Sequence, residues 1–141
     1  MNVKVKLLSP EAKAPVKSHI DDAGWDLFSA KEATVGPGET RVIPTGISME
    51  IPHGWYGQIK SRSGLGSKGL IVTAGVVDSG YRGEVGVVVI NSKTDGEFIF
   101  KAGDKIAQMV LLPVPEVSFE VTDELNNTKR GEKGFGSTGV N

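Results

Sequence analysis

The last residues of the chain form a glycine-rich stretch whose spacing could bind phosphate. Residues 134–139 read GFGSTG and match G-x-G-x-x-G, in which glycines bring backbone N–H groups to a pyrophosphate at a helix N-terminus. Only Val140 and Asn141 follow, so we expect no helix there. A second match, GLGSKG at 64–69, precedes LIVTAGVV, whose β-branched residues favour a strand. Neither stretch predicts a dinucleotide-binding fold, but both can approach phosphate oxygens through their backbones.

The segment that surrounds GFGSTG cannot fold by itself. Residues 122–141 carry two large apolar side chains in twenty residues, Leu125 and Phe135, too few to repay the entropy of ordering them. Chain termini of this kind are commonly disordered. An aromatic ring in an otherwise polar segment instead favours ordering against a flat partner, on a ligand or on a neighbouring subunit.

Composition and charge exclude several functions. The 141 residues include 16 basic and 17 acidic side chains, and this net charge of −1 is not the footprint of a nucleic-acid binder. Without cysteine there are no disulfides or thiolate metal sites, and His19 and His53 are too far apart to suggest a transition-metal site. Lysines interrupt the N-terminal apolar residues, and no apolar run is long enough to span a membrane. We therefore expect a soluble, cytoplasmic protein with no nucleic-acid or membrane partner.

The elements that must position the chemical groups show a dominant period of two. Residues 3–7 and 117–121 alternate apolar and polar side chains, as half-buried strands do. Further strand-like stretches, separated by turns rich in Gly, Pro, Asn and Asp, lie at 41–44, 47–51, 55–60, 70–73, 84–90, 97–101 and 105–113. This pattern, with no long helical period, predicts one all-β sandwich or barrel. We expect its ordered core to end near residue 121 or 125.

Five segments taken together resemble a known family. In chain order they are AGWDLFSA (23–30), SRSGLGSKG (61–69), AGVVDSGYRGEVGVVVIN (74–91), GDKIAQMVLLP (103–113) and RGEKGFGSTG (130–139). Their order and spacing resemble the five motifs of the trimeric dUTP pyrophosphatases (dUTPases), over about residues 23 to 139. Two positions depart from the family pattern: Trp25 holds a variable position, and Lys133 stands where the arm usually has glycine.

The resemblance implies a fold and an activity. The fold would be an all-β, jelly-roll-like β-barrel over residues 1–125, with a flexible C-terminal arm over residues 126–141 that carries the glycine-rich lid motif. Three chains would form a homotrimer with active sites at the subunit interfaces. The enzyme would be a dUTP diphosphatase that converts dUTP to dUMP and pyrophosphate with Mg²⁺. It would keep uracil out of DNA and supply dUMP for dTMP synthesis.

The resemblance also assigns roles to individual side chains. Asp78 would be the catalytic base that activates a water for attack on the α-phosphorus, a task that suits a positioned carboxylate. Asp26 would hold Mg²⁺ indirectly, through water. Tyr81 would pack on the deoxyribose and exclude a 2′-hydroxyl. The uracil edge would pair with backbone groups of Gly75, Val76 and Val77. Without the resemblance, Asp-Ser-Gly is ordinary turn chemistry and a tyrosine here is equally a cross-strand aromatic.

Phosphate binding is implied for three parts of the chain. The resemblance assigns the phosphates to Arg62, Ser63, Gly64, Gln108, Arg130, Gly136, Ser137 and Thr138. The guanidinium of Arg130 would grip the γ-phosphate, and Phe135 would stack over the uracil ring. Closure of the arm would exclude water and place the substrate for attack. Seen alone, a glutamine in a strand is usually polar filler, and Ser-Gly is common in loops.

Three alternatives stay open. The dCTP deaminases share this architecture, but in that family a second arginine follows the Arg-Ser pair, and residues 64–68 contain none. A non-enzymatic β-barrel binding module would have no need for Asp78, Arg130 and Phe135 together. An additional regulatory role through an unknown protein partner is compatible with catalysis.

Overall fold

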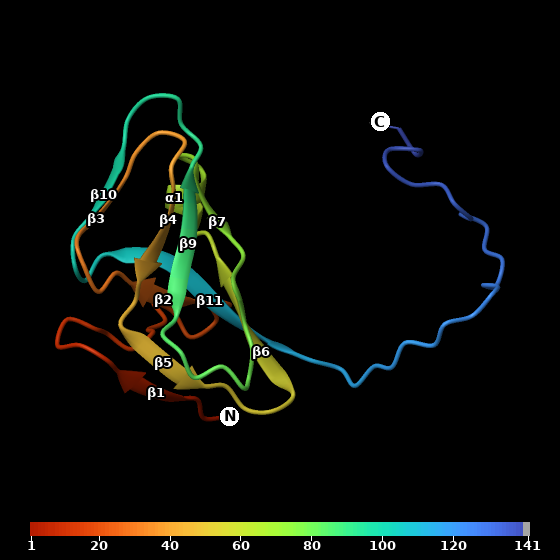
Figure 1. The fold of residues 1–141 in the computed structure, drawn as a ribbon, viewed down its shortest axis with the longest axis horizontal. Helices are drawn as coiled ribbons and strands as arrows, with labels where there is room; N and C mark the ends of the chain where they lie inside the picture. The colour runs from red at the N-terminus through yellow and green to blue at the C-terminus, as the bar shows by residue number, and fades with distance from the viewer. Residues whose placement is uncertain (140–141) are drawn as a thin grey trace.

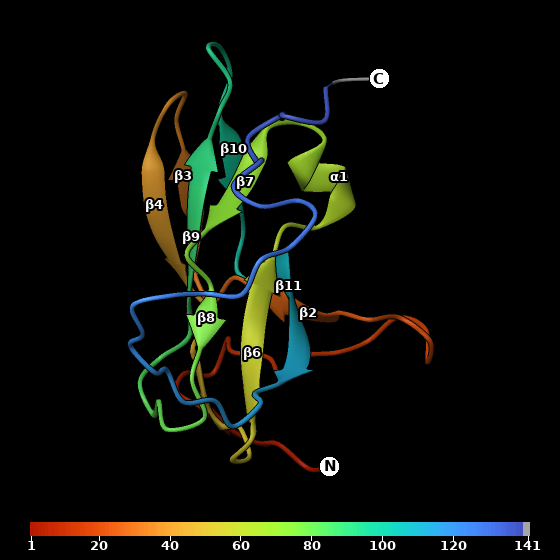
Figure 2. The ribbon, with the colours of Figure 1, turned by 90° about the vertical axis from the view of Figure 1, so that its right-hand side faces the viewer.

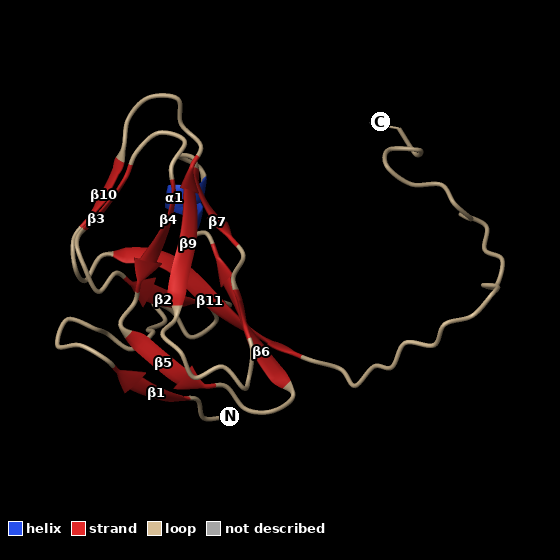
Figure 3. Ribbon diagram, in the orientation of Figure 1, coloured by secondary structure: helices blue, strands red, loops and turns tan. Residues whose placement is uncertain are grey.

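The computed structural model describes residues 1–139, and nearly all of its regular structure is β-strand (Figure 1, Figure 3). The strands are β1 (Lys4–Leu7), β2 (Trp25–Phe28), β3 (Ala33–Val35), β4 (Thr40–Pro44), β5 (Ile47–Glu50), β6 (Trp55–Lys60), β7 (Leu70–Thr73), β8 (Val76–Val77), β9 (Gly86–Asn91), β10 (Phe98–Phe100) and β11 (Lys105–Pro113). A single helical turn, α1 (Ser63–Gly66), lies between β6 and β7. Among these described residues, no helix is long and apolar enough to cross a membrane.

Antiparallel pairing joins the strands into sheets around one core. The largest sheet has the order β2-β11-β6-β8, and a second has the order β4-β9-β7. The pairs β1-β5 and β10-β3 lie near opposite ends of the body (Figure 1). Short antiparallel strands joined by tight turns are what the sequence pattern predicts. The predicted all-β fold is confirmed.

The core follows the alternation of side chains along the strands. In β9, Val87, Val89 and Asn91 are buried, whereas the residues between them are partly exposed. Both valines are fully inaccessible, as are Val35 of β3 and Ile43 of the neighbouring strand β4. Burying an aliphatic side chain of this size stabilises the fold by roughly 1.5–3 kcal/mol.

One polar side chain in this core connects β9 to β3 and to the loop before β10. Asn91 is fully buried, and its Nδ2 donates hydrogen bonds of 3.0 Å to the carbonyls of Val35 and Gly96. Its Oδ1 accepts the N–H of Lys93 at 3.0 Å. A buried amide is tolerated only when it is paired in this way.

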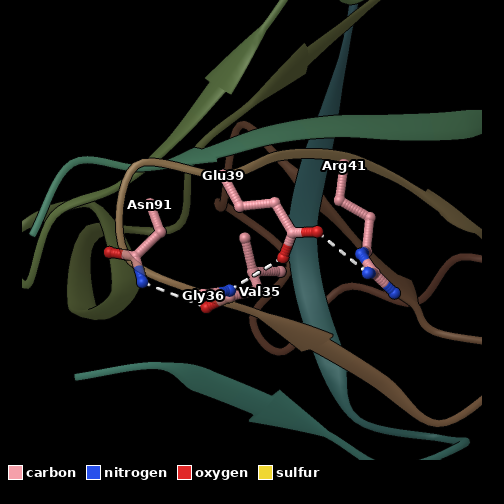
Figure 4. Close-up of polar contacts among 5 residues, drawn as sticks. All are labelled: Val35, Gly36, Glu39, Arg41 and Asn91. Atoms are coloured by element: carbon pink, nitrogen blue, oxygen red, sulfur yellow. Dashed lines mark hydrogen bonds and ion pairs between the residues drawn. The ribbon is translucent and has the colours of Figure 1, made fainter.

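A carboxylate closes the turn between β3 and β4 beside Asn91. Glu39 accepts the N–H of Gly36 at 2.8 Å and the guanidinium of Arg41 at 2.9 Å (Figure 4). The hydrogen bond from Gly36, followed by the interaction with Arg41, lowers the pKa of Glu39. The turn is therefore stabilised by the charged form of this carboxylate.

The observed strands agree with the predicted ones up to β11, which ends at Pro113. The prediction of a strand at 117–121 is wrong: this segment forms no strand, and its apolar residues Val117, Phe119 and Val121 are exposed. Alternation gives a segment strand propensity, but a strand also needs a neighbour, and this segment leaves the body (Figure 1). The elements β2, β3, β8 and α1 were not expected, because a period is hard to recognise in two to four residues. The domain boundary at residue 125 stays a prediction.

Candidate active site

Three neighbouring strands place Asp26 and Gln108 in one row across the largest sheet. Asp26 of β2 pairs with Gln108 of β11, which pairs on its other side with Lys60 of β6. Residues directly opposite each other in antiparallel strands share a face, so the carboxylate and the amide project to the same side. Two of the five sequence segments, far apart in the chain, therefore meet here.

Two cations contact the carboxylate of Asp26. Lys105 Nζ lies 3.1 Å from Oδ2 and Arg62 Nε lies 3.4 Å from Oδ1. The side chain of Asp26 is only 15% exposed, so its charge is compensated where water reaches it poorly. The result is a cluster of one carboxylate and two cations beside the Gln108 amide.

A β-bulge brings Lys105 into this cluster. In a regular strand, Lys105 and Gln108 would face opposite sides because they are three positions apart. The register against β2 shifts between Lys105 and Ala107, and this shift re-aims the lysine toward Asp26. The sequence interpretation did not include Lys105. The available signal was the adjacent buried pair Ile106 and Ala107, which breaks the alternation of β11.

The side chain of Gln108 joins the segments further. Its Nε2 donates a hydrogen bond of 3.0 Å to the carbonyl of Ser61. It lies directly over Gly24, where an added Cβ would come within 2.8 Å of the amide carbon. The amide of Gln108 therefore fits only because Gly24 has no side chain. Through these contacts, Gln108 links the first, second and fourth segments.

Arg62, Ser63 and Gly64 lie at the start of α1. Arg62 is the N-cap in an extended conformation, and the helical bonds begin with Gly66 N–H donating to its carbonyl. The N–H groups of Ser63 and Gly64 precede the first bond, so the helix offers them no acceptor. Both residues are exposed. These N–H groups can donate to an anionic oxygen.

The strand β8 is an edge of the largest sheet and follows Gly75. Gly75 has φ of +107°, and a Cβ would lie 2.8 Å from the carbonyl oxygen of Ile59, so glycine is required there. Ile59 N–H donates to the Gly75 carbonyl at 2.8 Å. Val77 is buried and Val76 is exposed. An edge strand presents backbone donors and acceptors that can pair with a planar base.

A tight loop after β8 carries Asp78 and Tyr81. The Tyr81 N–H donates to the Asp78 carbonyl at 3.1 Å and closes a turn. The Tyr81 hydroxyl donates to the carbonyl of Glu84 at 2.9 Å, and the Glu84 carboxylate accepts the N–H of Gly46 at 3.1 Å. Asp78 is exposed. The Asp-Ser-Gly segment is thus a turn, as its composition predicts, and it presents a carboxylate to solvent.

One chain does not bring all these residues together. Val77 pairs with Gly57 near the start of β6, whereas Arg62 follows the end of β6 at Lys60. At about 3.3 Å per residue, the five positions from 57 to 62 separate the two groups by roughly 15 Å. The loop after β8 and α1 lie toward opposite ends of the body (Figure 2).

The C-terminal arm holds a third group of residues away from both. Val114 N–H still bonds to the Gly54 carbonyl at 2.8 Å, and the hydrogen bonds of the described residues beyond it are local. Arg130 Nε donates to the Lys133 carbonyl at 2.8 Å, and Phe135 is fully exposed. The three remaining residues to which the resemblance assigns phosphate binding are also exposed: Gly136, Ser137 and Thr138. The final two residues of the predicted arm, 140 and 141, lie outside the described residues.

Comparison with known proteins shows to which family the chain belongs. The dUTPase family model matches residues 10–139. The deoxyuridine 5′-triphosphate nucleotidohydrolase of Clostridium tetani is 44% identical over 140 residues, covering 97% of this chain and 96% of that protein. The Staphylococcus bacteriophage 80alpha dUTPase with dUpNHpp has a TM-score of 0.91 and 34% identity over 99% of both chains. A mutant dUTPase of phage phi11 of S. aureus, with a structural Mg(II) ion, has a TM-score of 0.84 and 30% identity over 90% of this chain and 100% of that chain.

Fold and comparisons define a nucleotide hydrolase built on a jelly-roll-like β-barrel. The chain belongs to the dUTPase family and is a dUTP diphosphatase. This confirms the resemblance seen in the five sequence segments. The deaminase and the non-enzymatic binding module are both excluded as the primary identity.

Proposed function

We propose that Asp78 is the base of dUTP hydrolysis. A carboxylate within hydrogen-bond reach of a water can accept its proton as the oxygen attacks. A bond forms between the water oxygen and the α-phosphorus, the bond to the bridging oxygen breaks, and pyrophosphate leaves with the electron pair, which gives dUMP. Asp78 is exposed on a loop whose turn and side-chain hydrogen bonds fix its position.

The single observation that carries the proposal is the convergence of Asp26, Arg62 and Gln108 beside the free N–H groups at the start of α1. A guanidinium, an amide and first-turn N–H groups are donors suited to a chain of phosphate oxygens. Arg62, Ser63 and Gly64 would bind the phosphates, with Gln108 near the α-phosphate. The uracil edge would pair with the backbone of Gly75, Val76 and Val77 at the edge of β8.

Separation of these groups within one chain supports a homotrimer with shared sites. The loop of Asp78 and the cluster around Asp26 lie too far apart to hold one α-phosphate between them, so a second chain must complete each site. Apolar surface is available for such contacts at Val117, Phe119 and Val121. The body also has an apolar cleft of about 330 Å³, lined by Val3, Val5, Ala14, Pro15, Trp25, Met49, Met109 and Leu111.

Mg²⁺ fits the residues present. Among residues 1–139, no three His, Asp or Glu side chains gather into a metal site, whereas Asp26 offers one poorly exposed carboxylate beside the proposed phosphate site. Mg²⁺ keeps several waters and is bound largely by substrate phosphates, so Asp26 would hold it through water. When bound, the ion neutralises charge on the phosphates. The phage phi11 relative has a structural Mg(II) ion.

The arm would act as a lid, on its own chain or a neighbour. Arg130 would bind the γ-phosphate, and Phe135 would stack on the uracil. Gly136, Ser137 and Thr138 would donate to the terminal phosphates. Support comes from the arm itself, which exposes an aromatic ring and a guanidinium that the body does not use. In the cell, this cytoplasmic enzyme would keep uracil out of DNA and supply dUMP for dTMP synthesis.

The test is pyrophosphate release from dUTP, dTTP, dCTP and UTP in parallel, with Mg²⁺ and with EDTA. We expect turnover of dUTP alone, lost in EDTA. Ammonia from dCTP would contradict the proposal, and so would undiminished turnover in EDTA. Sedimentation of the full chain should give three subunits, and a monomer with full activity would contradict the shared site.

A further inference from the structure

The loop 81–84 contains a glycine that its backbone conformation does not require. Most glycines in the turns of this chain have positive φ, a conformation that favours glycine, but Gly83 does not. Its reason lies in the ring of Tyr81. A Cβ on Gly83 would lie 2.5 Å from Cζ and 2.8 Å from Cε1 of that ring, closer than non-bonded carbons approach.

The ring is held in this position from its other end as well. The Tyr81 hydroxyl donates to the Glu84 carbonyl at 2.9 Å. Glu84 is itself fixed to the body, because its carboxylate accepts the Gly46 N–H at 3.1 Å and the next residue, Val85, donates its N–H to Ile47 at 2.8 Å. The tyrosine therefore folds back over Gly83 onto an anchored acceptor.

Tyr81 in this position still offers surface to a ligand. The side chain is 47% exposed, although its hydroxyl and part of its ring are engaged by residues 83 and 84. Arg82 points elsewhere, donating to the carbonyls of Ser79 at 2.8 Å and of Tyr81 at 3.2 Å. The open part of the ring is the surface that the resemblance to the dUTPases would place against the deoxyribose.

We propose that Gly83 is a positioning residue that sets substrate specificity: because it has no side chain, the Tyr81 ring can lie in the position that excludes a 2′-hydroxyl. This inference rests on the proposed role of Tyr81. A methyl group at position 83 would displace the ring and break the hydrogen bond from the Tyr81 hydroxyl to the Glu84 carbonyl. Because the displaced atoms are the far end of one side chain and the lost hydrogen bond is exposed to water, the change should cost little stability. Discrimination against ribose then weakens, since a ring held at another height no longer fits the sugar.

The experiment is a double-mutant cycle on kcat/KM for dUTP and UTP. Gly83→Ala should lower the ratio of the two values at least tenfold, with the loss mainly in KM for dUTP and a gain for UTP. Gly80→Ala is the matched control: it lies in the same loop, its φ is also ordinary, and no described atom outside residues 79–81 comes within 4 Å of its added Cβ. It should change the ratio by less than about twofold.

The Tyr81→Ala background separates the two proposals. There the Cβ at 83 has room, so Tyr81→Ala with Gly83→Ala should match Tyr81→Ala alone, and this comparison holds even if Gly83→Ala folds poorly. Equal losses in both backgrounds, an unchanged ratio in Gly83→Ala, or an equal loss in Gly80→Ala would each overturn the inference. If Tyr81→Ala itself keeps full discrimination, the role of Tyr81 is wrong and the inference falls with it. Failure of the wild-type chain to hydrolyse dUTP would instead contradict the proposed function.

Discussion

The β-sheet body and the C-terminal arm hold their functional residues in different ways. On the body, Asp26, Gln108 and Arg62 are placed by cross-strand pairing and by ion pairs of 3.1 and 3.4 Å with Asp26. On the arm, Arg130 and Phe135 are held only by local turns, such as the bond from Arg130 to Lys133. In the proposed mechanism the body would meet the substrate with its groups in place, whereas the arm would lose conformational entropy on binding. Changes to the arm should affect activity without affecting stability, and some changes to the body should do the reverse.

The largest effect should come from Asp78→Asn. The amide keeps the size of the side chain but cannot take the proton of the attacking water, so kcat should fall by about 10²–10⁴-fold. Pyrophosphate release at saturating dUTP measures the loss, with thermal unfolding as the control for folding. Turnover at the wild-type rate would remove Asp78 from the mechanism.

Removal of residues 129–141 should come next and tests the arm alone. Without the lid, we expect a loss of about 10²-fold in kcat/KM, because water enters and the phosphates lose their outer donors. The melting temperature should not change, since within residues 1–139 the last hydrogen bond from this end of the chain to the body is made by Val114. Full activity of the truncated enzyme would refute the lid.

Asn91→Ala is the opposite case, since it removes a buried side chain to which no role in substrate binding is assigned. It deletes three hydrogen bonds of 3.0 Å in a fully buried site and leaves carbonyls unpaired. The free energy of unfolding should fall by about 2–4 kcal/mol in urea titration. Activity at low temperature should stay close to wild type, and a large loss of kcat in folded protein would mean that the core and the site are coupled.

Lys105→Met tests how much the charge cluster around Asp26 contributes to substrate binding. The substitution removes one of the two cations on Asp26 and leaves its charge less compensated near the triphosphate. We expect KM for dUTP to rise by about three- to tenfold with a smaller change in kcat. Lys105→Arg keeps the charge and should stay near wild type. If both variants behave alike, the charge is not what matters.

The smallest effect concerns the pH dependence of stability. The pKa of Glu39 is lowered by the Gly36 N–H and by Arg41, so this carboxylate stabilises the fold above its ordinary pKa and stops doing so as pH falls through the lowered value. Glu39→Gln should therefore be less stable than wild type at neutral pH, and the difference should shrink as pH falls below the ordinary pKa of a glutamate and through the lowered pKa of Glu39. Urea midpoints across this range measure it. A constant difference would contradict the assignment.

Much of the body could be predicted because its signals are local. The strands at 55–60, 70–73 and 105–113 have the predicted bounds, since alternation and turn residues are visible over that length. The roles of Asp78 and of the glycine-rich tail were inferred from five segments in order, and they stay predictions. Lys105 could not, because only the register of β11 against β2 shows that a bulge turns it toward Asp26.

The sequence by itself determined the all-β class, the turns and the identity of the chemical groups, because strand periodicity, turn residues and motifs are properties of neighbouring residues. The tertiary structure decided which groups meet. Long-range pairing brings Asp26 to Gln108, while the length of β6 keeps Asp78 away from them. It also decided that residues 117–121 form no strand, because pairing depends on a neighbour in space that no local pattern records.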